Sequence, residues 1–437
     1  MRWSLPFFFT LTSLSAIQAD TQSAMRVLRD ECLGCHKPGK AKGGLLLTTR
    51  EKMLIGGDNG TSVVPGKPAE SPLYQLVLEE ADPHMPPKKQ LGKEQIAALQ
   101  SWIQAGAAWD AAVFDELPKP SPVALSPLPA AYQPVLALAI SPDEKRLAIA
   151  AGSRVHLHDL TQPQNPRMGS LSGHDETVQS VIWTADGKTV ITGGFRQIKL
   201  WDAATQQSQG EIRANFVGNL TALALTNDQR TLFASDGEPG GAGFIHRVDL
   251  TEKKIIATWK AHDDTIYSLK LSPTGQSLAS AAADKLARLW NVADGKLISS
   301  YEGHTNHVLS VAFNQDATQL ATAGADREIK VWDVKSREQD VTLGDKKTVF
   351  TALAWTPDGK ALVAITDKGS GSIYTELKKH DGAQRSDTAK QTKLNSTGNM
   401  LYSVAITGDA KKIFAGGDEG KVWLWDGAGK QTGSIAP

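Results

Sequence analysis

A short turn segment returns at a nearly constant interval through the C-terminal part of this 437-residue chain. Its seven copies read SPD, TAD, TND, SPT, NQD, TPD and TGD, start at Ser141, Thr184, Thr226, Ser272, Asn314, Thr356 and Thr407, and lie 43, 42, 46, 42, 42 and 51 residues apart. An apolar, alternating strand precedes each turn and another follows it, and several units end in a Trp-Asp pair. This period near 42 residues predicts an all-β, seven-bladed propeller with four strands per blade over residues 132–437.

The ends of the repeating units carry a more specific signature. The opening pairs are Gly173-His174, Ala261-His262 and Gly303-His304, and the closing pairs are Trp201-Asp202, Trp332-Asp333, Trp425-Asp426 and the near match Trp290-Asn291. On these residues the segment resembles the WD-repeat family. The resemblance implies a propeller that docks another protein, an inference from fold alone.

The same resemblance implies a buried hydrogen-bond chain across a complete blade. Two units place its expected members at spacings of 6, 16 and 6 residues: His262, Ser268, Asp284 and Trp290 in one, and His304, Ser310, Asp326 and Trp332 in the other. Blade two has His174, Ser180 and Trp201 but no Asp at the matching place. We therefore expect its chain to be incomplete.

Other units depart further from the pattern. His158-Asp159, Val248-Asp249 and Ile373-Tyr374 replace the Trp-Asp pair in the first, third and sixth units. The longest interval contains KKHDGAQRSDTAKQTKLN, expected to form a loop or a lengthened outer strand. Two segments are candidates for the last outer strand of the ring: the residues after Trp425 and those near Val123.

The N-terminal part of the chain has a different organisation. Residues 20–116 show helical periodicity, and the proline-rich residues 117–131 predict an extended linker. Arg2 and an apolar run from Leu5 to Leu14 predict a signal peptide over residues 1–19, cut after Ala19, with a retained membrane anchor as the alternative. No other stretch has the length of a transmembrane helix. We expect a mature chain that is exported, to the periplasm or an equivalent compartment.

Both cysteines of the chain lie in one motif, Cys32-Leu33-Gly34-Cys35-His36. In a C-x-x-C-H sequence two thiols can bind haem covalently while the histidine ligates its iron. A thioredoxin-like pair would need a βαβ context, and a zinc site would need a second pair of ligands, neither of which this part of the sequence offers. We therefore predict one covalently attached haem c, which agrees with export.

The second iron ligand must come from elsewhere, and Met85 in DPHMPPKK is the best candidate because the flanking prolines restrict its backbone. Met25 and Met53 are expected in the core. His84 is the rival ligand, and an open position is the remaining alternative. Five lysines near the two ligand segments could surround the haem edge and attract an acidic redox partner, or simply be solvated: Lys37, Lys40, Lys42, Lys88 and Lys89.

More than half of this domain resembles the planctomycete-type cytochrome c domain, in ECLGCHKPGKAKGGLLLTTREKMLIGGDNGTSVVPGKPAESPLYQLVL and HMPPKKQLGKEQIAALQSWIQAGAAW. The resemblance implies an all-α, class I-like cytochrome fold with Cys32 and Cys35 as haem anchors, His36 as proximal ligand and Met85 as distal ligand. Gly92 departs from the family's usual Thr or Ser at the start of the last helix. It offers no side-chain cap, so we expect that helix end to fray.

These features predict an exported electron carrier without substrate chemistry of its own, with a redox partner protein and an unidentified protein on the propeller. Lys+Arg and Asp+Glu both total 47, so no basic excess favours nucleic acid. One alternative is a redox enzyme fed by the haem domain. Its spare candidate ligands on the propeller would be His156, His246, His307 and His380. The other is a haem-based sensor, which would need an open distal position.

Overall fold

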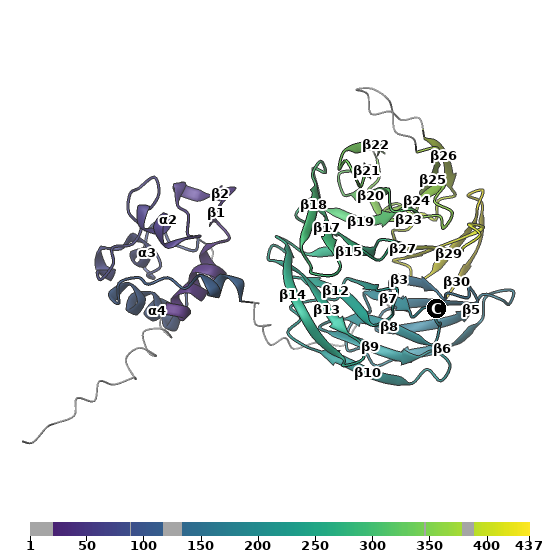
Figure 1. Ribbon diagram of the computed structural model, residues 1–437, viewed down its shortest axis with the longest axis horizontal. Coiled ribbons are helices and arrows are strands. Elements are labelled where there is room, and N and C mark those ends of the chain that lie inside the picture. Colours follow the sequence, from purple (N-terminus) through teal and green to yellow (C-terminus); the bar gives the residue numbers. More distant parts are fainter. Residues whose placement is uncertain (1–20, 88, 117–132, 345–346, 378–388) are drawn as a thin grey trace, which may run out of the picture. The chain divides into compact units, whose positions relative to one another are not determined.

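The computed structural model describes residues 21–87, 89–116, 133–344, 347–377 and 389–437 (Figure 1). The chain divides into two compact units, Met1–Pro118 and Lys119–Pro437. The predicted signal peptide, the predicted linker, Lys88 and His380 lie outside the described residues. Within the described ranges, no helix is long and apolar enough to cross a membrane.

The N-terminal unit is built from short helices and irregular connections. Residues 21–27 are helical and continue into a π-helical turn, η1 (Leu28–Cys32). The following elements are β1 (His36–Lys37), β2 (Lys40–Ala41), η2 (Lys42–Gly44), α2 (Arg50–Ile55), η3 (Pro68–Glu70), α3 (Pro72–Gln75), α4 (Lys93–Gln104) and η4 (Ala111–Asp115). Among the described residues only α4 is a regular α-helix of 12 residues. The all-α expectation is therefore not confirmed, since glycines and prolines between residues 34 and 72 interrupt helix formation.

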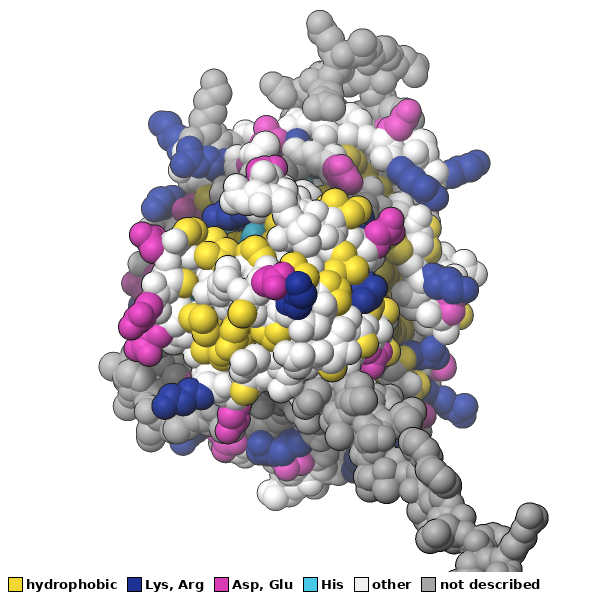
Figure 2. Space-filling view, turned by 90° about the vertical axis from the view of Figure 1, so that its left-hand side faces the viewer, with side chains coloured by type: hydrophobic (Ala, Val, Ile, Leu, Met, Phe, Trp, Pro, Cys, Tyr) yellow, Lys and Arg dark blue, Asp and Glu magenta, His cyan; other side chains and the backbone are white. Residues whose placement is uncertain are grey.

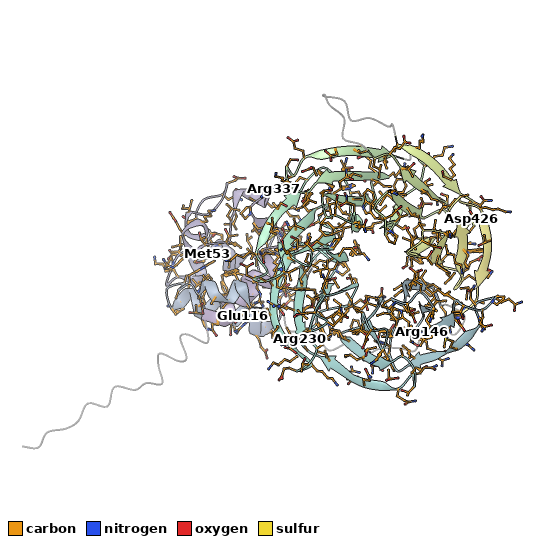
Figure 3. All side chains as sticks on the ribbon, turned by 45° about the vertical axis from the view of Figure 1, so that its right-hand side comes forward. Met53, Glu116, Arg146, Arg230, Arg337 and Asp426 are labelled. Carbon is orange, nitrogen blue, oxygen red and sulfur yellow. The ribbon has the colours of Figure 1, made fainter. Side chains whose placement is uncertain are left out.

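The core of this unit nevertheless uses the predicted apolar positions. Met25 and Met53 are fully buried, as expected for core methionines, and Figure 3 labels Met53 within the unit. Leu99, Trp102 and Ile103 bury one face of α4 in the same cluster. The indole of Trp102 donates to the carbonyl oxygen of Ala108 at 2.6 Å. This bond satisfies the polar atom of a side chain that is otherwise in an apolar environment.

The C-terminal unit is a ring of seven antiparallel four-stranded sheets, which Figure 3 views with the blades arranged around a centre. Blade 1 comprises β3 (Val135–Ile140), β4 (Arg146–Ala151), β5 (Arg154–Asp159) and β6 (Arg167–Ser172), and blade 2 comprises β7 (Ser180–Trp183), β8 (Thr189–Gly194), β9 (Gln197–Asp202) and β10 (Ser208–Arg213). Blade 3 comprises β11 (Ala222–Leu225), β12 (Thr231–Gly237), β13 (Gly243–Asp249) and β14 (Lys254–His262), and blade 4 comprises β15 (Ile266–Leu271), β16 (Ser277–Ala282), β17 (Ala287–Asn291) and β18 (Leu297–Tyr301). Blade 5 comprises β19 (Val308–Phe313), β20 (Gln319–Gly324), β21 (Glu328–Asp333) and β22 (Gln339–Gly344), and blade 6 comprises β23 (Phe350–Trp355), β24 (Ala361–Thr366), β25 (Gly371–Thr375) and β26 (Lys390–Leu394). Blade 7 comprises β27 (Leu401–Ile406), β28 (Lys412–Gly417), β29 (Val422–Asp426) and β30 (Gln431–Ile435). The seven-bladed prediction is confirmed.

The seven turn segments that reveal the repeat connect the first and second strands of each blade. At Thr184 the backbone N–H donates to the carbonyl of Thr189 at 2.9 Å, and the Thr184 hydroxyl accepts from the N–H of Thr189 at 3.0 Å. The same hydroxyl donates to Asp186 at 2.7 Å. In the five turns with a Ser or Thr followed two residues later by Asp, these side-chain hydrogen bonds close the turn. Ser272 and Asn314 accept the equivalent backbone N–H in the other two, which explains the periodic occurrence of the segment.

Ring closure uses the residues after Trp425. Strand β30 pairs with β29 and forms the outer edge of blade 7, so each blade consists of consecutive strands of the chain. Blades 7 and 1 share an apolar cluster that includes Val135, Leu138 and Phe414. Across this seam the backbone N–H of Leu138 donates to the hydroxyl of Ser403 at 3.1 Å. The alternative closing segment near Val123 lies outside the described residues.

The buried hydrogen-bond chain is present in blades 4 and 5, but one predicted member was wrong in each. In blade 4, His262 contacts Asp284 through Nδ1 at 3.0 Å and the hydroxyl of Ser280 through Nε2 at 2.7 Å. The indole of Trp290 donates to the same hydroxyl at 2.8 Å. Ser280, not Ser268, is therefore the hydroxyl of this chain.

Blade 5 repeats the arrangement with Thr322, not Ser310. Thr322 lies 2.8 Å from His304 Nε2 and accepts from the Trp332 indole at 2.9 Å. Ser268 and Ser310 lie on the first strands of their blades. Their hydroxyls instead accept backbone N–H groups from the next blade, those of Val311 at 3.4 Å and Leu353 at 3.1 Å.

Blade 2 lacks the carboxylate, as the sequence predicts, but its predicted hydroxyl was wrong: Ser180 instead donates to the carbonyl of Leu220 at 2.7 Å. His174 Nε2 and the indole of Trp201 both contact the hydroxyl of Thr192, at 2.6 and 2.9 Å. Nδ1 of His174 is buried without a hydrogen-bond partner. Only Phe195 and Arg196 connect β8 to β9, so this short loop offers no carboxylate. Desolvation of the ring, with a smaller effect of the nearby Lys199, lowers the pKa of His174 to about 4.

Candidate functional site

The two cysteines lie on consecutive turns of one short segment. Cys32 ends the π-helical turn, and the backbone N–H of Cys35 donates to the carbonyl of Cys32 at 3.1 Å. Both are free thiols and both are partly buried. Desolvation raises the pKa of Cys32 to about 12, with smaller contributions from Glu31 and Cys35. Cys32 is therefore a neutral thiol at physiological pH.

His36 follows directly at the start of the small hairpin. Its carbonyl accepts from the N–H of Leu47 at 2.9 Å, and β1 pairs His36 with Ala41 in β2. Nδ1 of the His36 ring is buried without a hydrogen-bond partner. A buried polar atom without a partner is costly, and an imidazole beside two unpaired thiols has the donor chemistry of a c-type haem site. The residues present therefore fit this cofactor.

Met85 lies in a loop whose backbone is held by hydrogen bonds. Its N–H donates to the carbonyl of Leu76 at 2.7 Å, and its side chain is partly buried. Both ring nitrogens of the rival, His84, are already in contact with oxygens: Nδ1 with Pro86 at 3.0 Å and Nε2 with Gln90 at 2.7 Å. His84 would have to lose one of these contacts to bind a metal, so the arrangement favours Met85.

A carboxylate links the Met85 segment to the cysteine segment. Glu31 Oε1 accepts from Lys89 Nζ at 2.6 Å and from Gln95 Nε2 at 3.1 Å. Burial of Glu31 raises its pKa, but the hydrogen bonds from Lys89 and Gln95 outweigh burial, and the net shift is downward. Three segments therefore meet at Glu31: the end of η1, the residues after Met85, and α4. The sequence reasoning missed this contact, because 58 residues separate Glu31 from Lys89.

Gln95 also changes the expectation for Gly92. The side-chain oxygen of Gln95 accepts the backbone N–H of Gly92 at 2.9 Å. Gly92 is the residue before α4 and has no side chain that could cap the helix. The contact with Gln95 supplies part of the missing cap. The predicted fraying of the helix end is therefore opposed by a cap that comes from within the helix.

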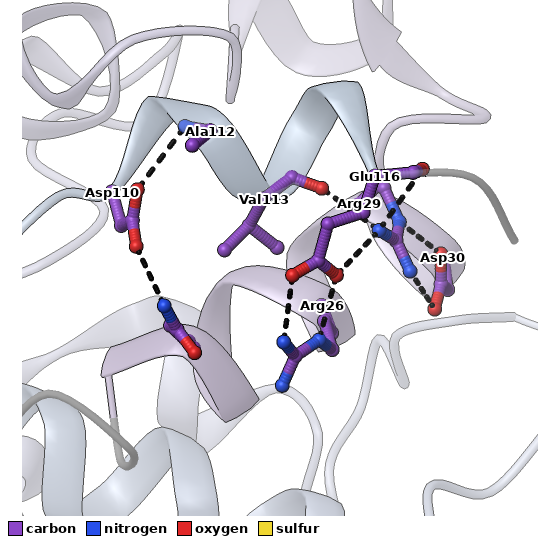
Figure 4. A network of polar contacts seen from close by, with 8 residues as sticks. Arg26, Arg29, Asp30, Asp110, Ala112, Val113 and Glu116 are labelled. Carbon is purple, nitrogen blue, oxygen red and sulfur yellow. Dashed lines mark hydrogen bonds and ion pairs between the residues drawn. The ribbon is translucent and has the colours of Figure 1, made fainter. Parts of the chain in front are cut away.

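A second network fixes the helix that leads into the cysteine motif (Figure 4). Arg26 makes two hydrogen bonds to the Glu116 carboxylate, at 2.8 and 2.7 Å. Arg29 donates to the carbonyl of Val113 at 2.8 Å and to Glu116 at 3.2 Å. The side-chain hydrogen bond from Arg26 is the main cause that lowers the pKa of Glu116. Hydrogen bonds to Val113 and Glu116, near the end of the described unit, thus fix the position of its first helix.

The five lysines that could attract an acidic partner are not equivalent. Lys40 and Lys42 are exposed in and after the β1–β2 hairpin, whereas Lys89 is paired with Glu31. Lys37 has an interaction partner, and Lys88 lies outside the described residues. Figure 2 shows basic and acidic side chains interspersed on one face of the molecule, with apolar side chains between them. A uniform basic surface is absent from this face.

The described histidines proposed as spare ligands on the propeller lie apart from one another. His156 Nδ1 contacts the hydroxyl of Ser170 at 2.8 Å, within blade 1. In blade 3, His246 contacts Asp236 at 2.9 Å and Thr258 at 3.0 Å. His307 is exposed and lies beside the ring of Tyr267, with 6.2 Å between ring centroids. In the described parts of both units, no three His, Cys, Asp or Glu side chains form a group that could hold a metal ion.

Comparisons with known proteins match both units. The family model "Planctomycete cytochrome C" matches residues 32–89, which include Cys32, Cys35, His36 and Met85. The model "WD domain, G-beta repeat" matches residues 165–202, 253–291 and 295–333. The first unit is therefore cytochrome c-like and the second is a WD-repeat propeller.

Curated relatives match about a third of the chain. "Cell division cycle 20.5, cofactor of APC complex" of Arabidopsis thaliana is 27% identical over 146 residues, 33% of this chain and 31% of that protein. "Anaphase-promoting complex subunit cdc20" of Dictyostelium discoideum is 29% identical over 147 residues, 33% of this chain and 28% of that protein. "WD repeat-containing protein 3" of Homo sapiens is 22% identical over 130 residues, 30% of this chain and 13% of that protein. The matches thus span less than a third of the length of each of these relatives.

Proposed function

We propose that this chain, which joins a cytochrome c-like unit to a WD-repeat propeller, is an exported c-type cytochrome that transfers electrons. Cys32 and Cys35 would anchor one haem, His36 would be its proximal ligand and Met85 its distal ligand. The observation that carries the proposal is the motif itself: two free thiols on consecutive turns, followed by an imidazole with one buried nitrogen that has no partner among the described residues. A haem bound there would supply one-electron redox chemistry.

The residues of the chain would determine how this cofactor is held. The hairpin and the contact of His36 with Leu47 fix the backbone that presents the imidazole. Pro83 and Pro86 restrict the backbone around Met85, so the thioether is positioned at a low cost in conformational entropy. Two protein ligands would leave no position for a substrate, which supports electron transfer over catalysis.

The remaining parts of the proposal concern location and partners. Residues 1–19 would direct export to the periplasm or an equivalent compartment, and residues 117–131 would be a linker. The propeller would dock a protein whose identity the chain does not reveal. Exposed Lys40 and Lys42 would favour a redox partner with an acidic surface, through electrostatic steering.

The proposal is tested by the visible spectrum of the exported protein in its reduced form, with and without carbon monoxide. We expect a covalent c-type haem whose spectrum does not change with carbon monoxide, because both axial positions are taken. The double variant Cys32→Ala, Cys35→Ala should lack covalent haem while the propeller stays folded. Absence of haem from the unmodified exported protein would refute the proposal. Rapid binding of carbon monoxide would refute ligation by Met85 and favour a sensor or an enzyme.

A further inference from the structure

The first strands of the seven blades form the inner wall of the ring, defined here as β3, β7, β11, β15, β19, β23 and β27. The residues one and three places before each turn segment are large and apolar. The residues four places before it are small: Ala137, Ser180, Ala222, Ser268, Ser310, Ala352 and Ser403. The residues two places before it are Ala139, Ile182, Ala224, Lys270, Ala312, Ala354 and Ala405. Five of seven blades therefore have alanine where blade 4 has a lysine.

Hydrogen bonds give the direction of the small side chains. The hydroxyls of Ser268, Ser310 and Ser403 accept backbone N–H groups from the inner strand of the next blade, at 3.4, 3.1 and 3.1 Å. Because side chains two residues apart in a strand share a face, Lys270 lies on the same face of β15 as Ser268. Lys270 thus has a long, solvent-exposed side chain at a wall position where most blades have only a methyl group.

Lys270 is the only charged residue on the inner wall, all of which the structure describes. Its side chain is exposed to solvent, and its ammonium forms no hydrogen bond or ion pair with any described residue. Desolvation by the surrounding protein lowers its pKa. The other six blades have an alanine or an isoleucine at this position, so the blade fold does not require a charged side chain there.

We propose that Lys270 is a binding point for a carboxylate that enters the ring, an activity distinct from the proposed electron transfer. The inner wall carries one positive charge and no second cation, which matches the single negative charge of a carboxylate better than the higher charge of a phosphate. The equivalent residues of the two adjacent blades, Ala224 and Ala312, are small. The source is either an acidic side chain of a protein segment or a small free carboxylate, which share this chemistry.

The test measures binding of a triglutamate peptide and of acetate to the full-length protein by calorimetry, at constant ionic strength set with chloride. We expect saturable binding that Lys270→Ala weakens by about tenfold or more, because a charge-assisted contact is lost. Lys270→Arg should retain binding. Lys335→Ala, which changes an exposed lysine outside the inner wall, should leave it unchanged.

The variants can be interpreted because alanine already occupies this position in five blades. We expect Lys270→Ala to unfold at the same temperature as the unmodified protein or at a higher one. Binding of the peptide alone would identify a protein segment as the source, and equal site-specific binding of acetate would identify a free carboxylate. Absence of binding of both probes, or equal binding by the unmodified protein and Lys270→Ala, would overturn the proposal.

Discussion

At the scale of single residues, Glu31 joins three segments of the cytochrome-like unit. Its carboxylate is only 14% exposed and joins Lys89 to Gln95. Lys89 lies four residues after Met85, and Glu31 directly precedes Cys32. The pair therefore holds the candidate distal-ligand segment against the segment with the haem anchors.

We expect Glu31→Gln to lower the unfolding temperature of the N-terminal unit by a few degrees, because an ion pair with one exposed partner contributes about 1 kcal/mol or less. The measurement is thermal unfolding of the haem-loaded protein, followed by haem absorption. The matched control is Glu70→Gln, since Glu70 pairs with Lys67 at 3.0 Å while both side chains are about 60% exposed. Equal effects of the two variants would contradict the assigned role of Glu31.

The effect of Glu31→Gln should also depend on pH. The pKa of Glu31 is lowered from its ordinary value of 4.5 in the folded protein, so its stabilising effect is complete above pH 4.5. It is lost as the pH falls through the folded-state value. The difference between Glu31→Gln and the unmodified protein should therefore be constant near neutrality and disappear in acid. A difference that grows in acid would contradict this assignment.

The residues of the site differ in how far the sequence predicts them. The C-x-x-C-H motif and the prolines beside Met85 are both local sequence patterns. The candidate haem anchors and the candidate distal ligand can therefore be predicted from the sequence alone. The contact between Glu31 and Lys89 depends on how two distant segments fold together. Lys270 was missed although the signal was present: aligning the seven turns shows one lysine among five alanines and one isoleucine.

At the scale of elements, the hydrogen-bond chain distinguishes complete from incomplete blades. Asp326 contacts His304 Nδ1 at 2.9 Å and accepts from the N–H of Thr305 at 2.8 Å. In blade 2 the equivalent ring nitrogen of His174 has no partner. The propeller thus folds with one blade that lacks the carboxylate. In blade 5, by contrast, the buried His304 ring and the N–H of Thr305 both use Asp326 as their acceptor.

We expect Asp326→Ala to reduce the free energy of unfolding of the propeller by about 1–3 kcal/mol, because buried donors lose their acceptor. Denaturant unfolding of the full chain, followed by tryptophan fluorescence, measures this change. Glu302→Ala is the control, since Glu302 is exposed and only two residues from His304. If both variants unfold at the same denaturant concentration, the chain does not stabilise blade 5.

The elements also show where sequence reasoning fails. The turns are predicted correctly because their first side chain bonds to the adjacent backbone, and in five of the seven a Ser or Thr also bonds to the Asp two residues later. Ser180, Ser268 and Ser310 were assigned wrongly because two neighbouring strands of each blade offer a hydroxyl. Distance along the chain does not tell which strand faces the histidine. Only the pairing of strands in three dimensions makes that choice.

At the scale of the whole molecule, the ring is complete without any strand from before residue 135. Blade 7 takes all four of its strands from residues 401–435. The sequence leaves this closure open, because two segments could form the last strand. The pairing of β30 with β29 decides between them.

Removal of residues 431–437 should therefore destabilise the propeller and leave the cytochrome-like unit unaffected. The deletion removes β30, whose Ile435 is buried against the seam cluster, and exposes the edge of β29. Limited proteolysis and tryptophan fluorescence would detect the change in the propeller, while haem absorption reports on the other unit. Replacing Thr432 and Ser434 with alanine, which keeps the strand backbone, is the control. A propeller unchanged by the deletion would contradict the role of β30.

The seam between blades 7 and 1 has a mechanical consequence. The chain enters the ring at β3, an innermost strand, and ends at β30, an outermost strand, so no blade is shared between the two ends of the ring. Pulling on the N-terminal side would therefore load an inner strand at the seam, where packing and single hydrogen bonds such as that of Leu138 with Ser403 resist separation. Under tension the ring would peel open from blade 1, one blade after another.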